Sequence, residues 1–307
     1  MLPIAKKFSL PKQKLHYTTR EKLKDLGMVT PALFLLALFT FYPLLYTLYL
    51  SFTKWNFIRP EKEWVGWKNY LWVFNNPDFY QVMKVTFLYT FFDVGITMIL
   101  GLLLALLLNK IARHYSIMRL LIFMPHYIAM VVCAMIFLWI FNTNYGILNQ
   151  IIAFFGLEPV NWLLSPKTAL WAIIIVTAWK STGYAMMIFL AGLRGIPAEY
   201  YEAAKVDGAN GWQRFWYITL PLLSPITLFL LVTSVIGSMQ VFQSVDVMTG
   251  GGPLNSTKVI VYWIYETAFH EFRVGRSSAL VVILFVILLT LTALMMKLSK
   301  RKVHYEG

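Results

Sequence analysis

Charged residues are scarce in this sequence. Of the 307 residues, 13% are charged and 59% are hydrophobic, whereas about a quarter of the residues of a soluble domain are charged. The composition therefore excludes an ordinary soluble domain and predicts a membrane protein. Cysteine is nearly absent as well: Cys133 is the only one, which excludes an intrachain disulfide and a metal cluster held by thiolates of this chain.

Basic residues exceed acidic ones, giving a formal net charge of +13. Such an excess fits either a nucleic acid or an anionic lipid as partner, and its distribution along the chain favours lipid and membrane topology, with no nucleic acid. Residues 1–28 form a basic tail with seven Lys or Arg. The apolar run after the tail lacks an A-x-A cleavage pattern, so it predicts a retained first helix instead of a removed signal.

Six apolar stretches approach or exceed the length that crosses a bilayer. The alternative, buried helices of a soluble core, is disfavoured by their number and length. The sequence predicts an all-α integral membrane protein with one membrane domain over residues 29–298 and a short tail, 299–307. The expected spans are Val29–Phe52, Thr86–Leu108, Met118–Phe141, Ala169–Leu193, Leu222–Phe242 and Ala279–Leu298.

The six expected spans place both termini on the same side of the membrane. Segments on that side carry 17 Lys or Arg, against 8 in the loops on the other side. Because basic residues gather on the cytoplasmic side, both termini are predicted to be cytoplasmic. In the outer segment 142–167, the short apolar patch Ile147–Phe155 is expected to form a surface or interfacial helix.

The cytoplasmic loop 195–221, between the fourth and fifth spans, has clear local signals. Pro197 suits the first position of a helix, and Gly208 can end that helix in a left-handed conformation, giving about eleven residues. Asn210 can cap a second helix, with Gln213 making the reciprocal contact. The loop is therefore expected to fold as a compact helix-turn-helix.

The first helix of this loop has a shallow surface that another protein's groove could approach. Ala203 and Ala204 provide small side chains, and Glu202 adds a charge at their border. An exposed helix of this kind can dock into a groove. These local signals leave open the alternative of an amphipathic connecting loop.

The spacing of residues in this loop resembles a family signature, E-A-A-x3-G-x9-I-x-L-P, of permease subunits in binding-protein-dependent ABC importers. The matching positions are Glu202, Ala203, Ala204, Gly208, Ile218, Leu220 and Pro221. The segments 41–43, 139–146 and 248–257 look like the sugar-permease branch, typified by maltose and glycerol-3-phosphate systems. The resemblance extends from the first span to the sixth.

The resemblance implies that the helix containing Glu202 is a coupling helix, which sits in a cleft of a cytoplasmic ATPase. It also implies a second permease subunit as heterodimer partner, two ATP-binding-cassette ATPases and an extracytoplasmic solute-binding protein. The implied location is a bacterial or archaeal inner membrane, crossed several times.

The chain itself lacks a G-x-x-x-x-G-K-[ST] phosphate loop, since Gly250-Gly251-Gly252 is followed by Pro253. We therefore expect a transport subunit and not an enzyme, without a cofactor of its own, while the partner ATPase binds ATP and magnesium. A membrane-embedded enzyme is disfavoured because no H-E-x-x-H or metal-ligand cluster is present. A secondary transporter is disfavoured because the spans show no internal repeat.

Polar and aromatic residues in the fourth and fifth spans are candidates for a substrate pathway. Sugars present apolar ring faces and many hydroxyls, so aromatic faces and hydrogen-bonding groups suit them. Packing, interfacial anchoring and hydrogen bonds within the helix are the alternatives. The candidates are Trp179, Lys180, Ser181, Tyr184, Ser234, Ser238 and Gln240.

Three ionisable residues fall within the expected spans, where a charge is costly without a partner or a cavity. Lys180 should face either Asp93 or a water-filled pathway. A permease for neutral sugars is expected to have an uncharged residue there, so Lys180 leaves room for an anionic substrate such as a uronate-containing oligosaccharide or a sugar phosphate. His126 follows Pro125, where a kink could expose it to the pathway, although packing is the commoner role.

Overall fold

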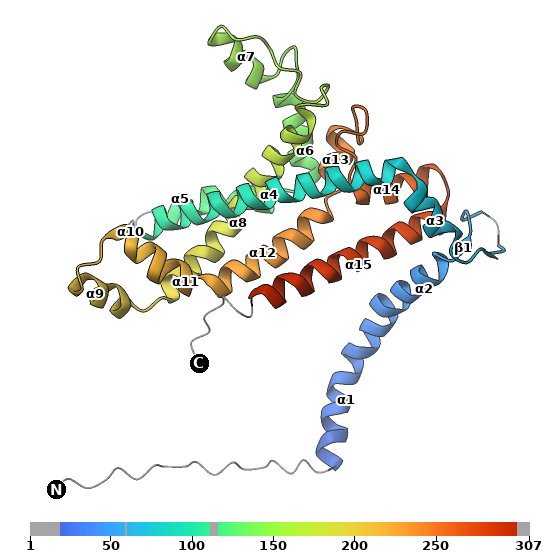
Figure 1. Ribbon diagram of the computed structural model, residues 1–307, viewed down its shortest axis with the longest axis horizontal. Helices are drawn as coiled ribbons and strands as arrows, with labels where there is room; N and C mark the ends of the chain where they lie inside the picture. Colours follow the sequence, from blue (N-terminus) through green and yellow to red (C-terminus); the bar gives the residue numbers. More distant parts are fainter. Residues whose placement is uncertain (1–18, 59, 111–115, 300–307) are drawn as a thin grey trace. The chain divides into compact units, whose positions relative to one another are not determined.

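The computed structural model describes residues 19–58, 60–110 and 116–299, and helices make up most of them (Figure 1). In this part of the chain the strands are β1 (Thr53–Lys54) and β2 (Glu63–Trp64), which pair antiparallel. Contacts divide the chain into two units, residues 1–49 and 50–307. Each unit is described by itself.

The first unit contains a long apolar helix. It consists of α1 (Thr19–Leu36), a π-helical turn η1 (Ala37–Phe41) and α2, which runs to Leu50. From Lys24 to Leu50 it offers 27 residues that are long and apolar enough to cross a membrane. The first apolar helix predicted from the sequence is therefore present, with its start shifted toward the N-terminus, while its retention stays a prediction.

The second unit is built around α4 (Pro77–Lys110), α8 (Ala169–Gly195), α12 (Ser224–Met239) and α15 (Val274–Ser299). Helix α4 packs lengthwise against α8 and also contacts α12 (Figure 1). Ala105, Met186 and Leu230 are fully buried in their shared core. The interface is tight because a side chain on Gly101 would come within 2.7 Å of Ala185 Cβ.

Helix α4 begins nine residues before the expected start at Thr86. Pro77 occupies its first position, where the missing amide hydrogen costs nothing. The amide of Asp78 donates to Asn76 Oδ1 at 3.0 Å and so closes the helix end. The polar first turns of this helix explain why hydropathy alone placed the start too late.

Two expected spans are broken. The third consists of α5 (Ser116–Phe123), the 3-10 turn η3 (Met124–Tyr127) and α6 (Met130–Ile140), with a bend of 98° between its halves. The fifth is reached through α10 (Gly211–Arg214), η4 (Phe215–Thr219) and α11 (Leu220–Leu222), followed by a bend of 62° into α12.

A proline lies close to each break, and proline weakens a helix because it lacks an amide donor and collides with the preceding turn. The bend of the third span falls at Ile128 and Ala129, whose ψ angles of 133° and 136° are not helical. Pro125 lies in η3, and Pro225 lies in the first turn of α12. Among the described residues, four helices are long enough to cross a membrane on their own, and up to six spans result if each bent pair is counted as one. The expected count of six stays a prediction.

Shorter helices complete the second unit. The apolar patch in the segment 142–167 forms α7, as expected, and its eight residues are too few to cross a bilayer. The short helices are α3 (Lys68–Asn75), α7 (Ile147–Phe154), α9 (Ala198–Val206), α13 (Gln243–Met248), α14 (Ile260–Tyr265) and the π-helical η5 (Glu266–His270).

Candidate functional site

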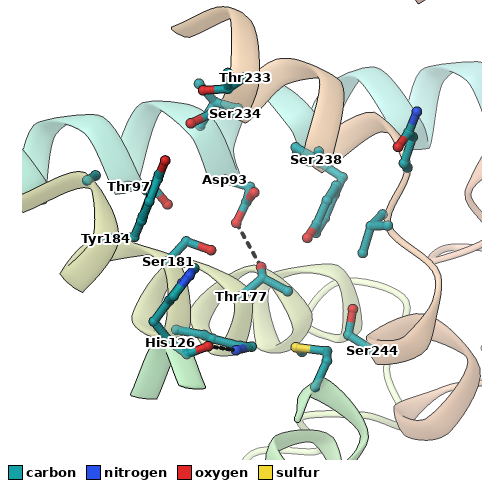
Figure 2. A pocket seen from close by; sticks show the side chains of 18 of the residues that line it. Asp93, Thr97, His126, Thr177, Ser181, Tyr184, Thr233, Ser234, Ser238 and Ser244 are labelled. Atoms are coloured by element: carbon teal, nitrogen blue, oxygen red, sulfur yellow. Dashed lines mark hydrogen bonds between the residues drawn. The ribbon is translucent and has the colours of Figure 1, made fainter. Parts of the chain in front are cut away.

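A cavity of about 500 Å³ lies among α4, α8, α12, α13 and the break at η3 (Figure 2). Hydroxyl, amide and ionisable side chains from all five elements face it. Its polar lining residues are Tyr89, Asp93, Thr97, His126, Thr177, Lys180, Ser181, Tyr184, Thr233, Ser234, Ser238, Gln240, Gln243 and Ser244.

Six of the seven pathway candidates from the sequence line this cavity: Lys180, Ser181, Tyr184, Ser234, Ser238 and Gln240. Trp179 does not. It lies on another face of α8, where it is 43% exposed and packs against Phe137 with ring centroids 5.3 Å apart. Successive residues of a helix point about 100° apart, and the direction taken by Trp179 is toward Phe137 of α6.

The Lys180 ammonium is held by the broken third span. It donates to the His126 carbonyl at 2.6 Å and to the Pro125 carbonyl at 3.3 Å. Helix ends leave carbonyls without intrahelical partners, and the break at η3 exposes such carbonyls beside α8. No ion pair joins Lys180 to Asp93 among the residues the structure describes, so the pairing considered from the sequence is not formed.

Glycine lets α8 approach the break closely enough for this contact. A β-carbon at Gly183 would overlap the Ile122 carbonyl and lie 2.8 Å from the Phe123 Cα. Gly183 follows Lys180 by three residues and therefore lies near the same helix face. The lysine and the glycine together fix α8 against the start of η3.

Asp93 forms the polar centre of the α4 wall. It is 8% exposed, and its Oδ1 accepts a hydrogen bond from the Thr177 hydroxyl at 2.8 Å (Figure 2). Two other buried hydroxyls of the lining, those of Thr97 and Ser244, have no hydrogen-bond partner within the described part of the chain. Buried hydroxyls without partners are uncommon, and these two are available to a ligand or to water.

An aromatic wall closes the cavity at the broken span. His126 stacks on Tyr184 with ring centroids 5.0 Å apart and an interplanar angle of 17°, and it also stacks on Phe123. The kink proposed at Pro125 is present and does expose His126 to the cavity.

The sequence also contained an unused signal for the α4 wall, because Tyr89, Asp93 and Thr97 recur every four residues and so share one face.

The signature loop folds much as its local signals predicted. The Gln213 amide donates to Asn210 Oδ1 at 2.9 Å, and the Asn210 amide donates to Gln213 Oε1 at 2.8 Å, which confirms the reciprocal cap. Gly208 has a φ of +77° and ends α9. Helix α9 has nine residues, not eleven, because Pro197 precedes its first turn.

Helix α9 has no buried residue. Glu202 and Ala203 are exposed and Ala204 is half-buried, as are Ile218, Leu220 and Pro221 in the η4–α11 segment. A polar contact joins the two parts of the loop: the hydroxyls of Tyr201 and Thr219 lie 3.0 Å apart. This contact connects α9 with the end of η4.

The glycine-rich loop after α13 is held by Tyr262. A β-carbon at Gly251, whose φ is +77°, would lie 2.9 Å from the Tyr262 ring. Burial, together with the nearby carboxylates of Glu266 and Asp246, raises the pKa of the Tyr262 hydroxyl. Because α13 carries Gln243 and Ser244 into the cavity lining, this packing supports one wall of the site.

Comparison with known proteins assigns the chain to a family. The family described as "Binding-protein-dependent transport system inner membrane component" matches residues 97–305. This chain belongs to that family. The permease is thus a multi-pass inner-membrane component of an ABC transporter, and its family is one of transport subunits and not of enzymes.

Relatives of the permease match it along most of its length. The trehalose/maltose transport system permease protein of Thermococcus litoralis is 34% identical over 290 residues, which are 94% of this chain and 96% of the relative. The sn-glycerol-3-phosphate transport system permease protein of Agrobacterium fabrum is 34% identical over 281 residues, 91% of this chain and 95% of the relative.

A solved structure has the same fold as the permease. It is the crystal structure of a bacterial alginate ABC transporter in complex with an alginate pentasaccharide-bound periplasmic protein. The TM-score is 0.81 at 23% identity, with 93% of this chain and 97% of that chain covered. The ABC permease fold expected from the loop signature is therefore confirmed.

Proposed function

We propose that the permease forms half of the translocation pathway for a carbohydrate. In this proposal a solute-binding protein delivers the substrate, and a related permease subunit completes the pathway as a heterodimer. Two ATPase subunits bind ATP and magnesium and supply the energy, so this chain needs no cofactor of its own. The names of the relatives, which include trehalose/maltose and sn-glycerol-3-phosphate systems, support a carbohydrate or a related polyol phosphate.

The observation that carries this proposal is the composition of the cavity. Its volume of about 500 Å³ falls in the range of small-molecule sites, roughly 300 to 1,000 Å³. Hydroxyls and amides can exchange hydrogen bonds with sugar hydroxyls, and the Tyr184 and His126 rings offer aromatic surface to a sugar ring. A substrate of this class would satisfy buried groups such as the Thr97 hydroxyl, which has no partner within the described chain.

The coupling role belongs to α9 in this proposal. Its surface is exposed, small side chains lie at Ala203 and Ala204, and its C-terminal end is closed by backbone hydrogen bonds such as that from the Ala209 amide to the Ala204 carbonyl at 2.8 Å. We propose that α9 docks into a cleft of the ATPase on the cytoplasmic side. We also propose six spans, which together with a cytoplasmic α9 place both termini in the cytoplasm, although residues 1–18 and 300–307 of the two tails lie outside the described residues.

Thiol labelling tests the orientation. In a background with the buried Cys133 replaced by alanine, a Gln213→Cys variant should react with impermeant reagents only from the cytoplasmic side. Gln150→Cys is the matched control, because it is an exposed glutamine on α7, and it should react only from outside. Labelling of Gln213→Cys from outside intact cells would place α9 outside the cell, where it could not contact an ATPase supplied with ATP, and would contradict the proposed orientation.

Uptake into proteoliposomes tests the transport function. The permease is reconstituted with its partner permease, ATPase and binding protein, and carbohydrates are compared with amino acids of similar size. We expect ATP-dependent uptake of a carbohydrate and no uptake of the amino acids. Uptake driven by an ion gradient without ATPase would support a secondary transporter, and chemical conversion of the substrate would support a membrane-embedded enzyme.

A further inference from the structure

A second cavity, of about 890 Å³, is lined by residues of β1, α3 and the start of α15. In the second unit, β1 and α3 lie at the end away from α9 (Figure 1). Loops, the two strands and the starts of two helices form it, so residues far apart in sequence converge there. Its charged lining residues are Lys54, Glu61, Lys62, Glu63, Lys68, Arg273 and Arg276.

Positive charge predominates in this basic cavity. Five cations and two carboxylates line it, and counting Glu271, the partner of Arg273, leaves an excess of two positive charges. Lys54 faces Glu63 at 4.0 Å, and Arg273 pairs with Glu271 at 3.1 Å. Lys62 and Arg276 instead lie over tryptophan rings, at 4.7 and 4.5 Å from the centroids. Ring faces attract cations without neutralising them. Lys62 and Arg276 therefore keep their positive charge and can attract an anion into the cavity.

The start of α15 adds to this positive field. Arg273, Gly275 and Arg276 all line the cavity, and α15 begins at Val274. The amide of Val274 donates to the Trp55 carbonyl at 3.0 Å, and the N-terminus of a long helix carries a partial positive charge that favours an anion such as a phosphate group. Gly275 lets β1 and α3 pack directly against this turn, because a β-carbon there would overlap the Thr53 carbonyl and lie 3.0 Å from Asn69 Nδ2.

The basic cavity also lies next in sequence to the ends of two candidate spans. One candidate span ends at Leu50, three residues before Thr53, and another begins at Val274. Exposed aromatic side chains lie in the segments next to these span ends: Trp64 is 63% exposed, Trp67 is 68% exposed and Phe272 is 49% exposed. Tryptophan and other aromatic residues gather at membrane interfaces, where lipid headgroups lie.

We propose that the basic cavity binds the phosphate-bearing headgroup of an anionic membrane lipid. The excess of positive charge and the N-terminus of α15 favour binding of a phosphodiester group. The two nearby span ends and the exposed aromatic residues favour a lipid of the bilayer over a soluble anion. With α9 on the cytoplasmic side, the lipid belongs to the outer leaflet. The site concerns lipid binding and is independent of which substrate occupies the cavity between α4 and α8.

Lipid titration of the purified, delipidated transporter complex tests this site. Phosphatidylglycerol and phosphatidylcholine are added in detergent, and bound lipid is counted by native mass spectrometry. Removing one basic residue near an anionic lipid surface weakens binding by about fivefold. Lys68→Gln, which changes an exposed side chain at the start of α3, should therefore raise the apparent Kd for phosphatidylglycerol about fivefold.

The double variant Lys68→Gln/Arg276→Gln should raise this Kd by about 25-fold on the same basis. Phosphatidylcholine binding should not change, and the control Lys167→Gln, an exposed lysine outside the cavity, should bind both lipids like the unaltered complex. Inorganic phosphate at millimolar concentration should not displace the lipid.

Three results would overturn the proposal. Unchanged phosphatidylglycerol binding by Lys68→Gln and by the double variant would remove the site. Full displacement of the lipid by inorganic phosphate would make it a site for a free anion. Unchanged lipid binding combined with weaker docking of the solute-binding protein would make it a protein contact. None of these experiments measures carbohydrate uptake. A negative result would therefore contradict the lipid site without bearing on the proposed transport function.

Discussion

Replacing Lys180 separates two roles that its position allows. The ammonium caps the His126 and Pro125 carbonyls of the broken span, and it also lines the cavity between α4 and α8. Of its three hydrogens, two are accounted for by these carbonyls, which leaves one donor for a substrate. Lys180→Met removes both the cap and the charge, whereas Lys180→Arg retains the charge.

The size of the expected effect follows from these contacts. A hydrogen bond to a charged group contributes about 1.5–3 kcal/mol, and 1.36 kcal/mol corresponds to a factor of about ten. If a carboxylate or phosphate of the substrate meets the Lys180 ammonium, Lys180→Met should slow uptake of the anionic substrate by about tenfold to a hundredfold. Loss of the carbonyl cap should act equally on charged and neutral substrates.

The assay compares an anionic carbohydrate with its neutral counterpart at saturating concentrations of loaded binding protein. We expect Lys180→Met to lower the ratio of anionic to neutral uptake at least about tenfold, and Lys180→Arg to leave this ratio almost unchanged. Equal loss for both substrates in Lys180→Met would refute the anion-binding role and leave the lysine as a cap. Unaltered uptake of both would refute both roles.

Three further substitutions test the coupling loop and the packing of the broken span. Gly208→Val places a β-branched residue at a φ of +77°, so membrane insertion should persist while substrate-stimulated ATP hydrolysis is lost; normal hydrolysis would argue against docking through this turn. Gly183→Ala should lower the Tm of the complex by several degrees because its methyl group meets the Ile122 carbonyl, whereas Gly95→Ala, in open space on α4, should not; equal Tm values would contradict the close approach. Tyr201→Phe removes the contact with Thr219 and should raise the ATP hydrolysed per substrate transported; an unchanged ratio would show that coupling does not use this contact.

Local signals in the sequence predicted local structure well. The reciprocal cap of Asn210 and Gln213 and the left-handed Gly208 depend on neighbours within a few residues, and both are found. Pro125 likewise marked the break that exposes His126. Such features are encoded by short-range sterics and hydrogen bonds, so one sequence is enough to infer them.

Features that depend on packing between helices could not be predicted in the same way. Trp179 and Lys180 are adjacent in a span, and only the placement of α6 beside α8 decides which of them faces the cavity. The partners of Lys180 are backbone carbonyls exposed by a break about 54 residues away, which no side-chain pattern reveals. Asp93 was considered as a partner for Lys180, but its hydrogen bond is with Thr177.

The most direct test of the proposed function is ATP hydrolysis by the reconstituted transporter. This permease is combined in proteoliposomes with its partner permease, the ATPase subunits and the solute-binding protein, with and without carbohydrate. We expect carbohydrate-loaded binding protein to stimulate hydrolysis only when this chain is present. The substitution Glu202→Lys in α9 should abolish the stimulation. Stimulation of the same size without this chain, or in the Glu202→Lys variant, would contradict its role as the coupled half of the pathway.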